Sequence, residues 1–269
     1  MYNEFYGFRE APFNITPDPR FLFLSRGHQE AFDHLLFGIR ERKGFIQLTG
    51  EVGAGKTTLC RALLDELGPD YRTALILNPC LTPLQLLKAV LVELELPPRH
   101  DRSSCLKELN GYLLEQAAAG HDVVLLIDEA QDMDRQLLEE VRLLSNLETD
   151  ERKLLQIALV GQPELRDLLD DRGLRQLRQR ILVRYHLGPL SREDTERYVG
   201  FRLAAAGANS RPTFSRWALR AVHRYSRGVP RLINAVCDKA LLCGYVLEED
   251  HLRARHVRRA IQELEGKVG

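Results

Sequence analysis

The sequence predicts an α/β domain built on a buried, five-stranded parallel sheet, followed by an all-helical domain. Short apolar segments alternate with amphipathic helical segments as far as residue 190, and after that point only helical patterns continue. Continuously apolar strands between helices are typical of a parallel sheet that is covered on both faces. We therefore expect three parts, which are an aromatic and proline-rich segment packed on the core (1–26), the core (27–190) and a helical lid (191–269).

The expected elements of the core follow in chain order. The opening segment is rich in Phe, Tyr and Pro, which favours irregular backbone whose rings pack elsewhere, and a helix is expected over 27–40. Strands are predicted at 45–49, 73–77, 123–127, 155–160 and up to 187. Between them we expect helices at 58–67, 82–94, 105–119, 135–148 and 163–170, and a final helix that begins near 174 and precedes the last strand. Thr82-Pro83-Leu84-Gln85 is a capping box with proline at the first helical position.

The lid is expected to hold four helices. Ser191 caps a helix that runs to 206 and ends at Gly207. Further helices are predicted near 215–227, 230–246 and 253–265. Arginines in this region are interspersed with acidic residues, so a solvated surface is favoured over a nucleic-acid surface.

Composition narrows the class of protein. Lys+Arg and Asp+Glu both number 38 in 269 residues, so no net charge draws the chain towards nucleic acid or anionic lipid. Five cysteines without a metal or CxxC spacing indicate buried thiols in a reducing compartment. The start lacks signal-peptide character, and the longest purely apolar run, Val123–Ile127, is far too short to span a bilayer. We expect a cytoplasmic protein that reaches a membrane only through a partner.

A phosphate-binding loop is the most informative motif, because the sequence matches G-x-x-x-x-G-K-[ST] between a strand and a helix. Glycines allow successive N–H groups to point at one anion, and the following helix N-terminus adds partial positive charge. Lys56 is expected to bind the β- and γ-phosphates, and the Thr57 hydroxyl to ligate Mg²⁺. The predicted nucleotide-binding residues are Gly50, Glu51, Val52, Gly53, Ala54, Gly55, Lys56, Thr57 and Thr58. The alternative is an ordinary glycine turn before a helix.

An acid pair ends the third strand. Asp128 and Glu129 follow the apolar run Val123–Ile127, which is a Walker B pattern, and should emerge at the carboxyl edge of the sheet beside the loop. Asp128 is expected to hold Mg²⁺, and Glu129 to polarise the attacking water. Many strands end in acids, but the combination with the loop is specific. A nucleotide switch can dispense with the second acid, whereas a hydrolase uses it.

Five more positions are candidates with plain alternatives. Gln162 follows the fourth strand and can orient water, or it is a surface glutamine before a Pro-started helix. Arg178 and Arg180, with Arg175, precede the last strand. One of them can reach a neighbouring subunit's γ-phosphate, or they form a solvated helix end that complements the macrodipole. Arg231 opens a lid helix after Pro230 and can reach back to the phosphates, or it is a surface residue.

Together these motifs resemble the AAA+ ATPases, and in particular the ExeA/GspA-type secretion ATPases and the MshM-type ATPase of MSHA pilus biogenesis. The finer similarity is carried by Phe5-Tyr6-Gly7-Phe8, Pro12–Phe21, Leu143–Glu148, Gly161-Gln162-Pro163-Glu164-Leu165, Leu177–Ile181 and Gly228–Asn234. It covers nearly the whole chain.

The resemblance implies a sheet in the order 5-1-4-3-2, nucleotide between core and lid, and the N-terminal segment near the adenine. It assigns sensor 1 to Gln162, the arginine finger to Arg180 with Arg178 as second choice, and sensor 2 to Arg231. The implied function is Mg²⁺-dependent ATP hydrolysis that supports a type IV (MSHA-like) pilus or type II secretion. A ring-type, nucleotide-dependent homo-oligomer at the inner membrane through a partner is expected. ExeA-like members continue into a transmembrane helix and a peptidoglycan-binding domain, so the end of this chain favours the shorter pilus type or a truncation.

Two other classes of function stay open. A DNA-associated AAA+ ATPase of the transposition-regulator type would have a similar core, although the balanced charge argues against nucleic acid. A nucleotide-gated scaffold with little turnover would not need both Asp128 and Glu129.

Overall fold

The structure is a computed structural model that describes residues 2–14, 18–149, 152–209 and 211–267. The chain divides into two compact units. The α/β unit comprises Gln29–Gly50 and Leu59–Leu187, and the helical unit comprises Met1–His28, Glu51–Thr58 and Gly188–Gly269. The phosphate-binding loop after Gly50 thus groups with the helical unit, although the sequence pattern assigned it to the core.

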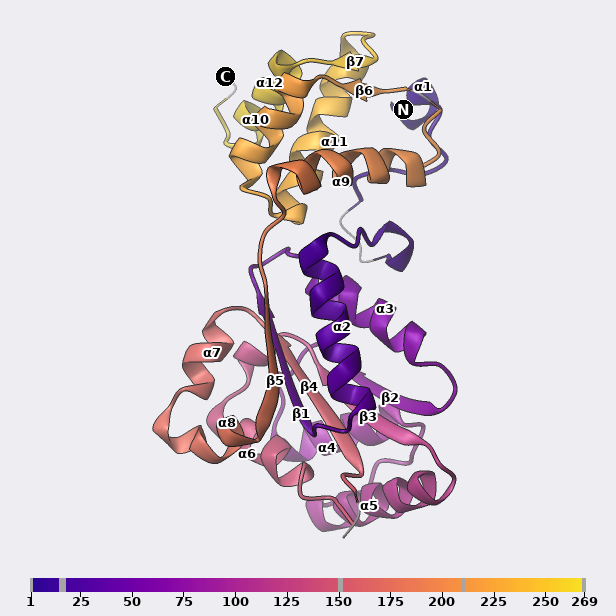
Figure 1. Ribbon diagram of the computed structural model, residues 1–269, viewed down its shortest axis with the longest axis vertical. Coiled ribbons are helices and arrows are strands. Elements are labelled where there is room, and N and C mark those ends of the chain that lie inside the picture. The colour runs from indigo at the N-terminus through magenta and orange to yellow at the C-terminus, as the bar shows by residue number, and fades with distance from the viewer. Residues whose placement is uncertain (1, 15–17, 150–151, 210, 268–269) are drawn as a thin grey trace. The chain divides into compact units, whose positions relative to one another are not determined.

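A single parallel sheet forms the centre of the α/β unit, with helices on both faces (Figure 1). Its strands run in the order β2-β3-β4-β1-β5, which is the expected order 5-1-4-3-2 read from the other edge. Both the fold class and the strand order are therefore confirmed. The strands are β1 (Phe45–Gly50), β2 (Tyr71–Ile76), β3 (Asp122–Ile127), β4 (Leu155–Gly161) and β5 (Ile181–Leu187).

Most helices of this unit begin within two residues of the predicted start, but α5 begins at Arg102, three residues before the predicted 105, because Asp101 caps it. Its helices are α2 (Arg26–Arg40), α3 (Lys56–Leu67), α4 (Pro83–Glu93), α5 (Arg102–Ala118), α6 (Arg135–Leu144), α7 (Glu164–Leu169) and α8 (Arg175–Arg180), the first turns of α2 and α3 lying in the other unit. The predicted capping box of α4 is present, because Gln85 N donates to Thr82 Oγ1 at 3.3 Å and Thr82 N donates to Gln85 Oε1 at 2.9 Å. Helix α6 ends at Leu144, short of the predicted 148, because Glu148 pairs with Lys153 in an antiparallel bridge.

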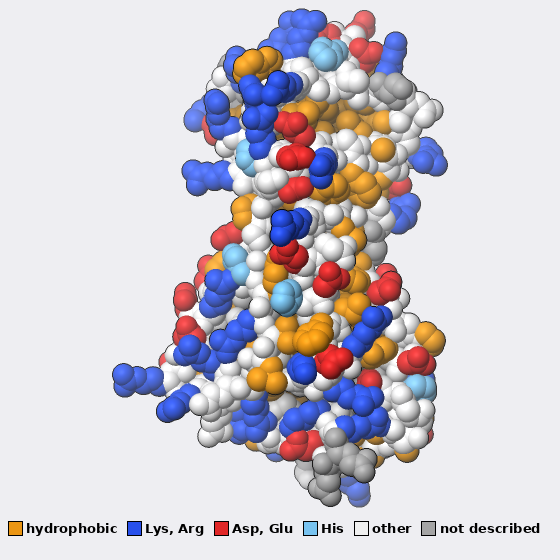
Figure 2. All heavy atoms as spheres, viewed as in Figure 1, with side chains coloured by type: hydrophobic (Ala, Val, Ile, Leu, Met, Phe, Trp, Pro, Cys, Tyr) orange, Lys and Arg blue, Asp and Glu red, His pale blue; other side chains and the backbone are white. Residues whose placement is uncertain are grey.

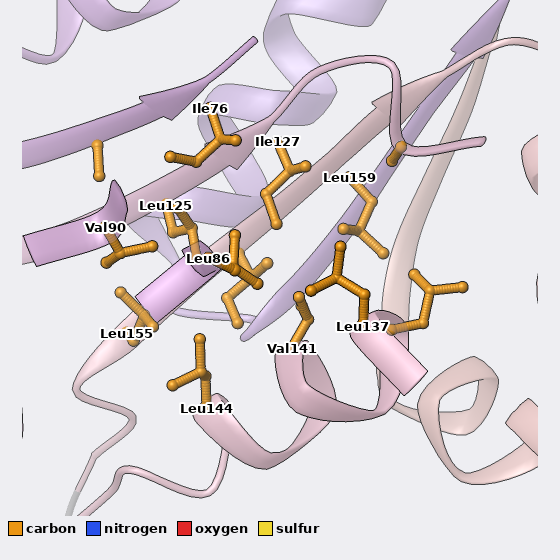
Figure 3. Close-up of a cluster of buried hydrophobic side chains, with 14 of the residues drawn as sticks. Ile76, Leu86, Val90, Leu125, Ile127, Leu137, Val141, Leu144, Leu155 and Leu159 are labelled. Atoms are coloured by element: carbon orange, nitrogen blue, oxygen red, sulfur yellow. The ribbon is translucent and has the colours of Figure 1, made fainter. Parts of the chain in front are cut away.

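The core of the α/β unit lies between the sheet and helices α4 to α8. Figure 3 shows side chains of β2, β3 and β4 packed against those of α4 and α6. The labelled residues are Ile76, Leu86, Val90, Leu125, Ile127, Leu137, Val141, Leu144, Leu155 and Leu159. Each fully buried Leu or Ile contributes about 1.5–3 kcal/mol, so this cluster holds β3 and β4 against α4 and α6.

The helical unit contains α1 (Tyr2–Tyr6), α9 (Arg192–Ala205), α10 (Arg216–Ser226), α11 (Pro230–Val246) and α12 (Ala254–Leu264). Ser191 caps α9 as predicted, since its side chain accepts from Asp194 N at 3.0 Å. The prediction of an all-helical lid was incomplete. Two short parallel strands, β6 (Thr213–Phe214) and β7 (His251–Leu252), pair just before α10 and α12, in runs too short for strand periodicity to register.

The N-terminal segment packs on the lid helices. Its buried rings, Tyr6, Phe8, Phe13 and Phe21, lie in the hydrophobic cluster of the helical unit. Arg202 of α9 lies over the Phe21 ring at 4.5 Å and donates to the carbonyl of Asn14 at 2.9 Å. The expectation that this segment packs on the ATPase core is corrected in this respect, because the apolar faces of α9 and α11 take up its rings.

The structure also bears on the predictions about the cysteines and about membrane-spanning segments. Four cysteines are buried, but Cys80 is exposed, which corrects the prediction that all five thiols are buried. Among the described residues, none of the helices combines the length and the apolar character needed to cross a bilayer.

Candidate functional site

The phosphate-binding loop leaves β1 at the carboxyl edge of the sheet. Gly53 and Gly55 have φ of +77° and +98°, a region that strains any residue with a Cβ. The loop closes through a hydrogen bond from Ala54 N to Glu51 O at 3.1 Å. These glycines therefore supply the conformations that a cradle of N–H groups requires.

Lys56 is held inside the same loop. The residue is only 6% exposed, and its Nζ donates to Glu51 O at 3.1 Å. Helix α3 begins at Lys56, so the N–H groups of its first turn lack partners within the helix. A cation together with the N–H groups of a helix N-terminus is the combination that favours bound phosphate.

The lid helix α11 contacts the loop through Arg231. The Arg231 N–H donates to Gly53 O at 3.2 Å, and a Cβ on Gly53 would lie 2.4 Å from Arg231 Cβ. The start of α11 is fixed by Gly228, whose φ is +83° and whose added Cβ would lie 2.0 Å from Leu190 O. The structure thus brings the predicted Arg231 to the loop backbone.

His28 supports the loop from helix α2, and sequence reasoning missed it. Its Nε2 lies 3.0 Å from Ala54 O, and its Nδ1 lies 2.8 Å from Ser25 Oγ. Burial lowers the pKa of His28, although the hydrogen bond to Ala54 partly opposes that shift. The network assigns a neutral ring that donates from Nε2 to Ala54 O and accepts at Nδ1 from the Ser25 hydroxyl. The only available signal was Ser25 as a helix cap, with His28 N donating to its Oγ.

The acid pair lies where β3 ends. Asp128 is 2% exposed, and its N–H donates to Ile76 O at 2.8 Å, extending the β2–β3 ladder by one residue. Its Oδ1 accepts from Glu129 N at 2.9 Å. Glu129 has φ +52° and ψ +36°, a left-handed conformation that costs a non-glycine residue about 1–3 kcal/mol. Such strain is typical of functional positions, where the surroundings hold the residue in place.

Two amide side chains hold the Glu129 carboxylate. Gln131 Nε2 donates to Glu129 Oε2 at 2.8 Å, and Gln162 Nε2 donates to the same oxygen at 3.2 Å. Gln131 Oε1 also accepts from Gln162 N at 2.9 Å. A Cβ on Gly161 would lie 2.7 Å from Gln131 Oε1, so glycine permits this approach. The structure therefore joins the predicted Glu129 and Gln162, and adds Gln131, whose only signal was a polar side chain two residues after the acid.

The predicted finger arginines differ in their surroundings. Arg180 Nη1 donates to Ser145 Oγ at 2.5 Å and to Asn146 Oδ1 at 2.6 Å, at the C-terminal end of α6. Arg178 is about half exposed and pairs with Asp170 at 3.1 Å. Arg175 is exposed, and no described residue forms an ion pair with it. Arg180 is thus anchored within its own chain, whereas Arg178 and Arg175 lie at the surface.

Known proteins share this fold. Residues 39–169 match the family described as an AAA domain. Aeropyrum pernix ORC2, solved as ADPNP-ADP complexes, gives a TM-score of 0.70 at 17% identity over 95% of this chain and 72% of that chain. Cdc6p from Pyrobaculum aerophilum gives 0.67 at 16% over 97% and 70%. The Thermotoga maritima RuvB branch migration motor gives 0.58 at 19% over 88% and 69%. The chain therefore has the α/β AAA+ fold.

One curated relative is similar along almost the entire chain. The general secretion pathway protein A of Aeromonas hydrophila is 47% identical over 270 residues, which is 99% of this chain and 49% of that protein. The likeness supports the expected kinship with the ExeA/GspA secretion ATPases. The chain spans about half the length of this relative.

Proposed function

We propose that this chain binds ATP with Mg²⁺ and hydrolyses the γ-phosphate. The observation that carries the proposal is Glu129, which stands in a strained conformation after β3 with its carboxylate held by Gln131 and Gln162. The two amide donors set Glu129 apart, because the exposed acids Glu95 and Glu248 also have a left-handed backbone. The strand that ends in this acid and the strand that leads into the phosphate-binding loop end at one edge of the sheet.

The proposed binding roles follow from the chemistry of each side chain. The loop Gly50–Thr58 would cradle the phosphates, with Lys56 as the cation and Arg231 on the lid side. The Thr57 hydroxyl and the Asp128 carboxylate are hard oxygen donors of the kind that Mg²⁺ prefers. When bound, Mg²⁺ supplies charge neutralisation at the phosphates. Aeropyrum pernix ORC2, which has a similar fold, was solved as ADPNP-ADP complexes, and this supports nucleotide binding.

Glu129 is suited to act on water because its two carboxylate oxygens differ. Both amide donors bind Oε2, and no described residue donates to Oε1. The free Oε1 would accept a proton from the attacking water, while the amides keep the carboxylate from turning away. Gln162, which stands beside the same carboxylate, would orient that water.

We propose a ring-type, nucleotide-dependent homo-oligomer, as the family resemblance implies, in which an arginine of a neighbouring subunit adds to the charge that Lys56 supplies. An arginine from a neighbour is worth about 10³–10⁵ in rate. Arg180 would have to leave Ser145 and Asn146 to act, whereas Arg178 would have to leave only Asp170. Specific activity should then rise with protein concentration, and a flat response would reject the finger.

The biological setting is proposed from the similarity to general secretion pathway protein A. We place the chain in type II secretion or in assembly of a type IV, MSHA-like pilus, acting from the cytoplasm through an inner-membrane partner. A deletion strain complemented by the wild-type chain but not by Glu129→Gln, scored for both secretion and pilus assembly, decides between the two systems. On the face of the helical unit shown in Figure 2, basic and acidic side chains are interspersed, and this gives no support to a DNA-associated alternative.

The direct test of catalysis is Glu129→Gln. We expect the variant to keep ATP binding and to lose turnover, because the amide cannot accept the proton from water. Glu115→Gln, which changes an exposed acid of α5, is the matched control and should hydrolyse ATP normally. Phosphate release by Glu129→Gln at the wild-type rate would remove Glu129 from its role.

A further inference from the structure

A polar cavity with a volume of about 340 Å³ lies wholly within the α/β unit, away from the phosphate-binding loop residues 51–58. Its floor is formed by Gln47 and Thr49 of β1 and their register partners Arg184 and His186 of β5. Register partners on adjacent strands share one face of a sheet, so these four side chains meet on the same side. Side chains of α7 and α8 complete the wall.

The Gln47 side chain at the bottom of this cavity is polar and has no hydrogen-bond partner among the described residues. The residue as a whole is 5% exposed. The amide atoms themselves are not among the buried, unpaired atoms of the described residues, so they are open to the cavity and to a ligand bound in it. The cavity thus offers a donor and an acceptor that the chain itself does not satisfy.

Two guanidinium groups with fixed directions line the same cavity. Arg166 Nε donates to Thr49 Oγ1 at 3.0 Å, and Arg184 Nη2 donates to Arg178 O at 2.6 Å. Neither Arg166 nor Arg184 has a carboxylate partner among the described residues, whereas Arg178 pairs with Asp170. Each of these two guanidinium groups uses one nitrogen to fix its direction and keeps its other N–H groups available.

We propose that this cavity binds a phosphoryl group, independently of the phosphate-binding loop. Three arginines and one aspartate line it, which leaves a net charge of two positive units against a phosphate dianion. A phosphoryl group presents three acceptor oxygens, which match the Gln47 amide and the guanidinium groups of Arg166 and Arg184. A carboxylate offers only two oxygens and one charge. The phosphoryl group can belong to inorganic phosphate or to a nucleotide.

The test uses the full chain carrying Lys56→Ala, so that the phosphate-binding loop does not contribute. Inorganic phosphate, ADP and acetate are titrated separately by calorimetry. We expect saturable binding of one equivalent of phosphate or ADP, and binding of acetate at least about tenfold weaker. Tighter binding of ADP than of phosphate identifies a nucleotide as the source, and tighter binding of phosphate identifies the free anion.

Two variants in the same background separate a site from a chance cavity. Gln47→Leu should weaken phosphate binding about tenfold or more, because the amide contact to the phosphoryl oxygens is lost. Arg184→Ala should weaken binding as much, whereas the matched control Arg258→Ala, at an exposed position of α12, should not. Absence of phosphate binding, equal binding of acetate, or binding that survives both variants would overturn the proposal. None of these outcomes depends on turnover by Glu129.

Discussion

Gln131 offers the sharpest test of how the acid pair is organised. In Gln131→Met the side chain keeps its length but loses its bond to Glu129 Oε2, at 2.8 Å, and its bond to Gln162 N, at 2.9 Å. A hydrogen bond to a charged group is worth about 1.5–3 kcal/mol. If that energy holds Glu129 in its reactive position, its loss lowers kcat about tenfold to hundredfold. Gln131→Glu keeps the acceptor for Gln162 N but places a second carboxylate against Glu129, so it should be slower still.

The assay measures phosphate release at saturating ATP together with the Kd of a fluorescent ATP analogue. Loss confined to kcat is expected, because Gln131 contacts Glu129 and Gln162. Gln136→Met, an exposed position at the start of α6, is the matched control. In a Glu129→Gln background the Gln131 change should add nothing further, because it acts through Glu129. A kcat within about twofold of wild type, or a loss found only in Kd, would refute the reasoning.

Two further predictions concern the phosphate-binding loop. Gly53→Ala should lower the free energy of unfolding by about 2–4 kcal/mol, because the added Cβ is strained at φ +77° and meets Arg231. Gly120→Ala has φ +85° but open space around it, so an equal loss in urea titrations of both variants would show that the Arg231 contact contributes nothing. Because burial holds the pKa of His28 below 6.5, its contribution to stability is complete above that pH and is lost as the pH falls. Between about pH 5 and 8, the melting temperature of His28→Gln should change less with pH than that of the wild type. An equal change with pH in both proteins would contradict the assignment.

Local patterns in the chain were enough to predict the fold class and the places where its elements begin. Apolar strands and amphipathic helices are periodic over a few residues, so the parallel sheet could be predicted from the residues, and its strand order from the family resemblance. Caps such as Thr82 and Ser191 act within one helical turn, and they were found where expected. The glycines of the loop and the acids after β3 are local signals of the same kind.

Which distant side chains meet depended instead on the folded chain. Gln131 and Gln162 are 31 residues apart, and their bond exists because β3 and β4 are neighbours in the sheet. His28 and Ala54 are likewise 26 residues apart, and their contact forms only in the folded chain. The N-terminal rings had no sequence signal to choose between core and lid, since burial of apolar surface is non-directional and rewards whichever face is available. Hydrogen bonds between residues far apart in sequence produce no periodic pattern in the sequence. For this reason the amide bonds of Gln131 and Gln162 to Glu129, and the position of Gln47 at a cavity, could be found only from the tertiary structure.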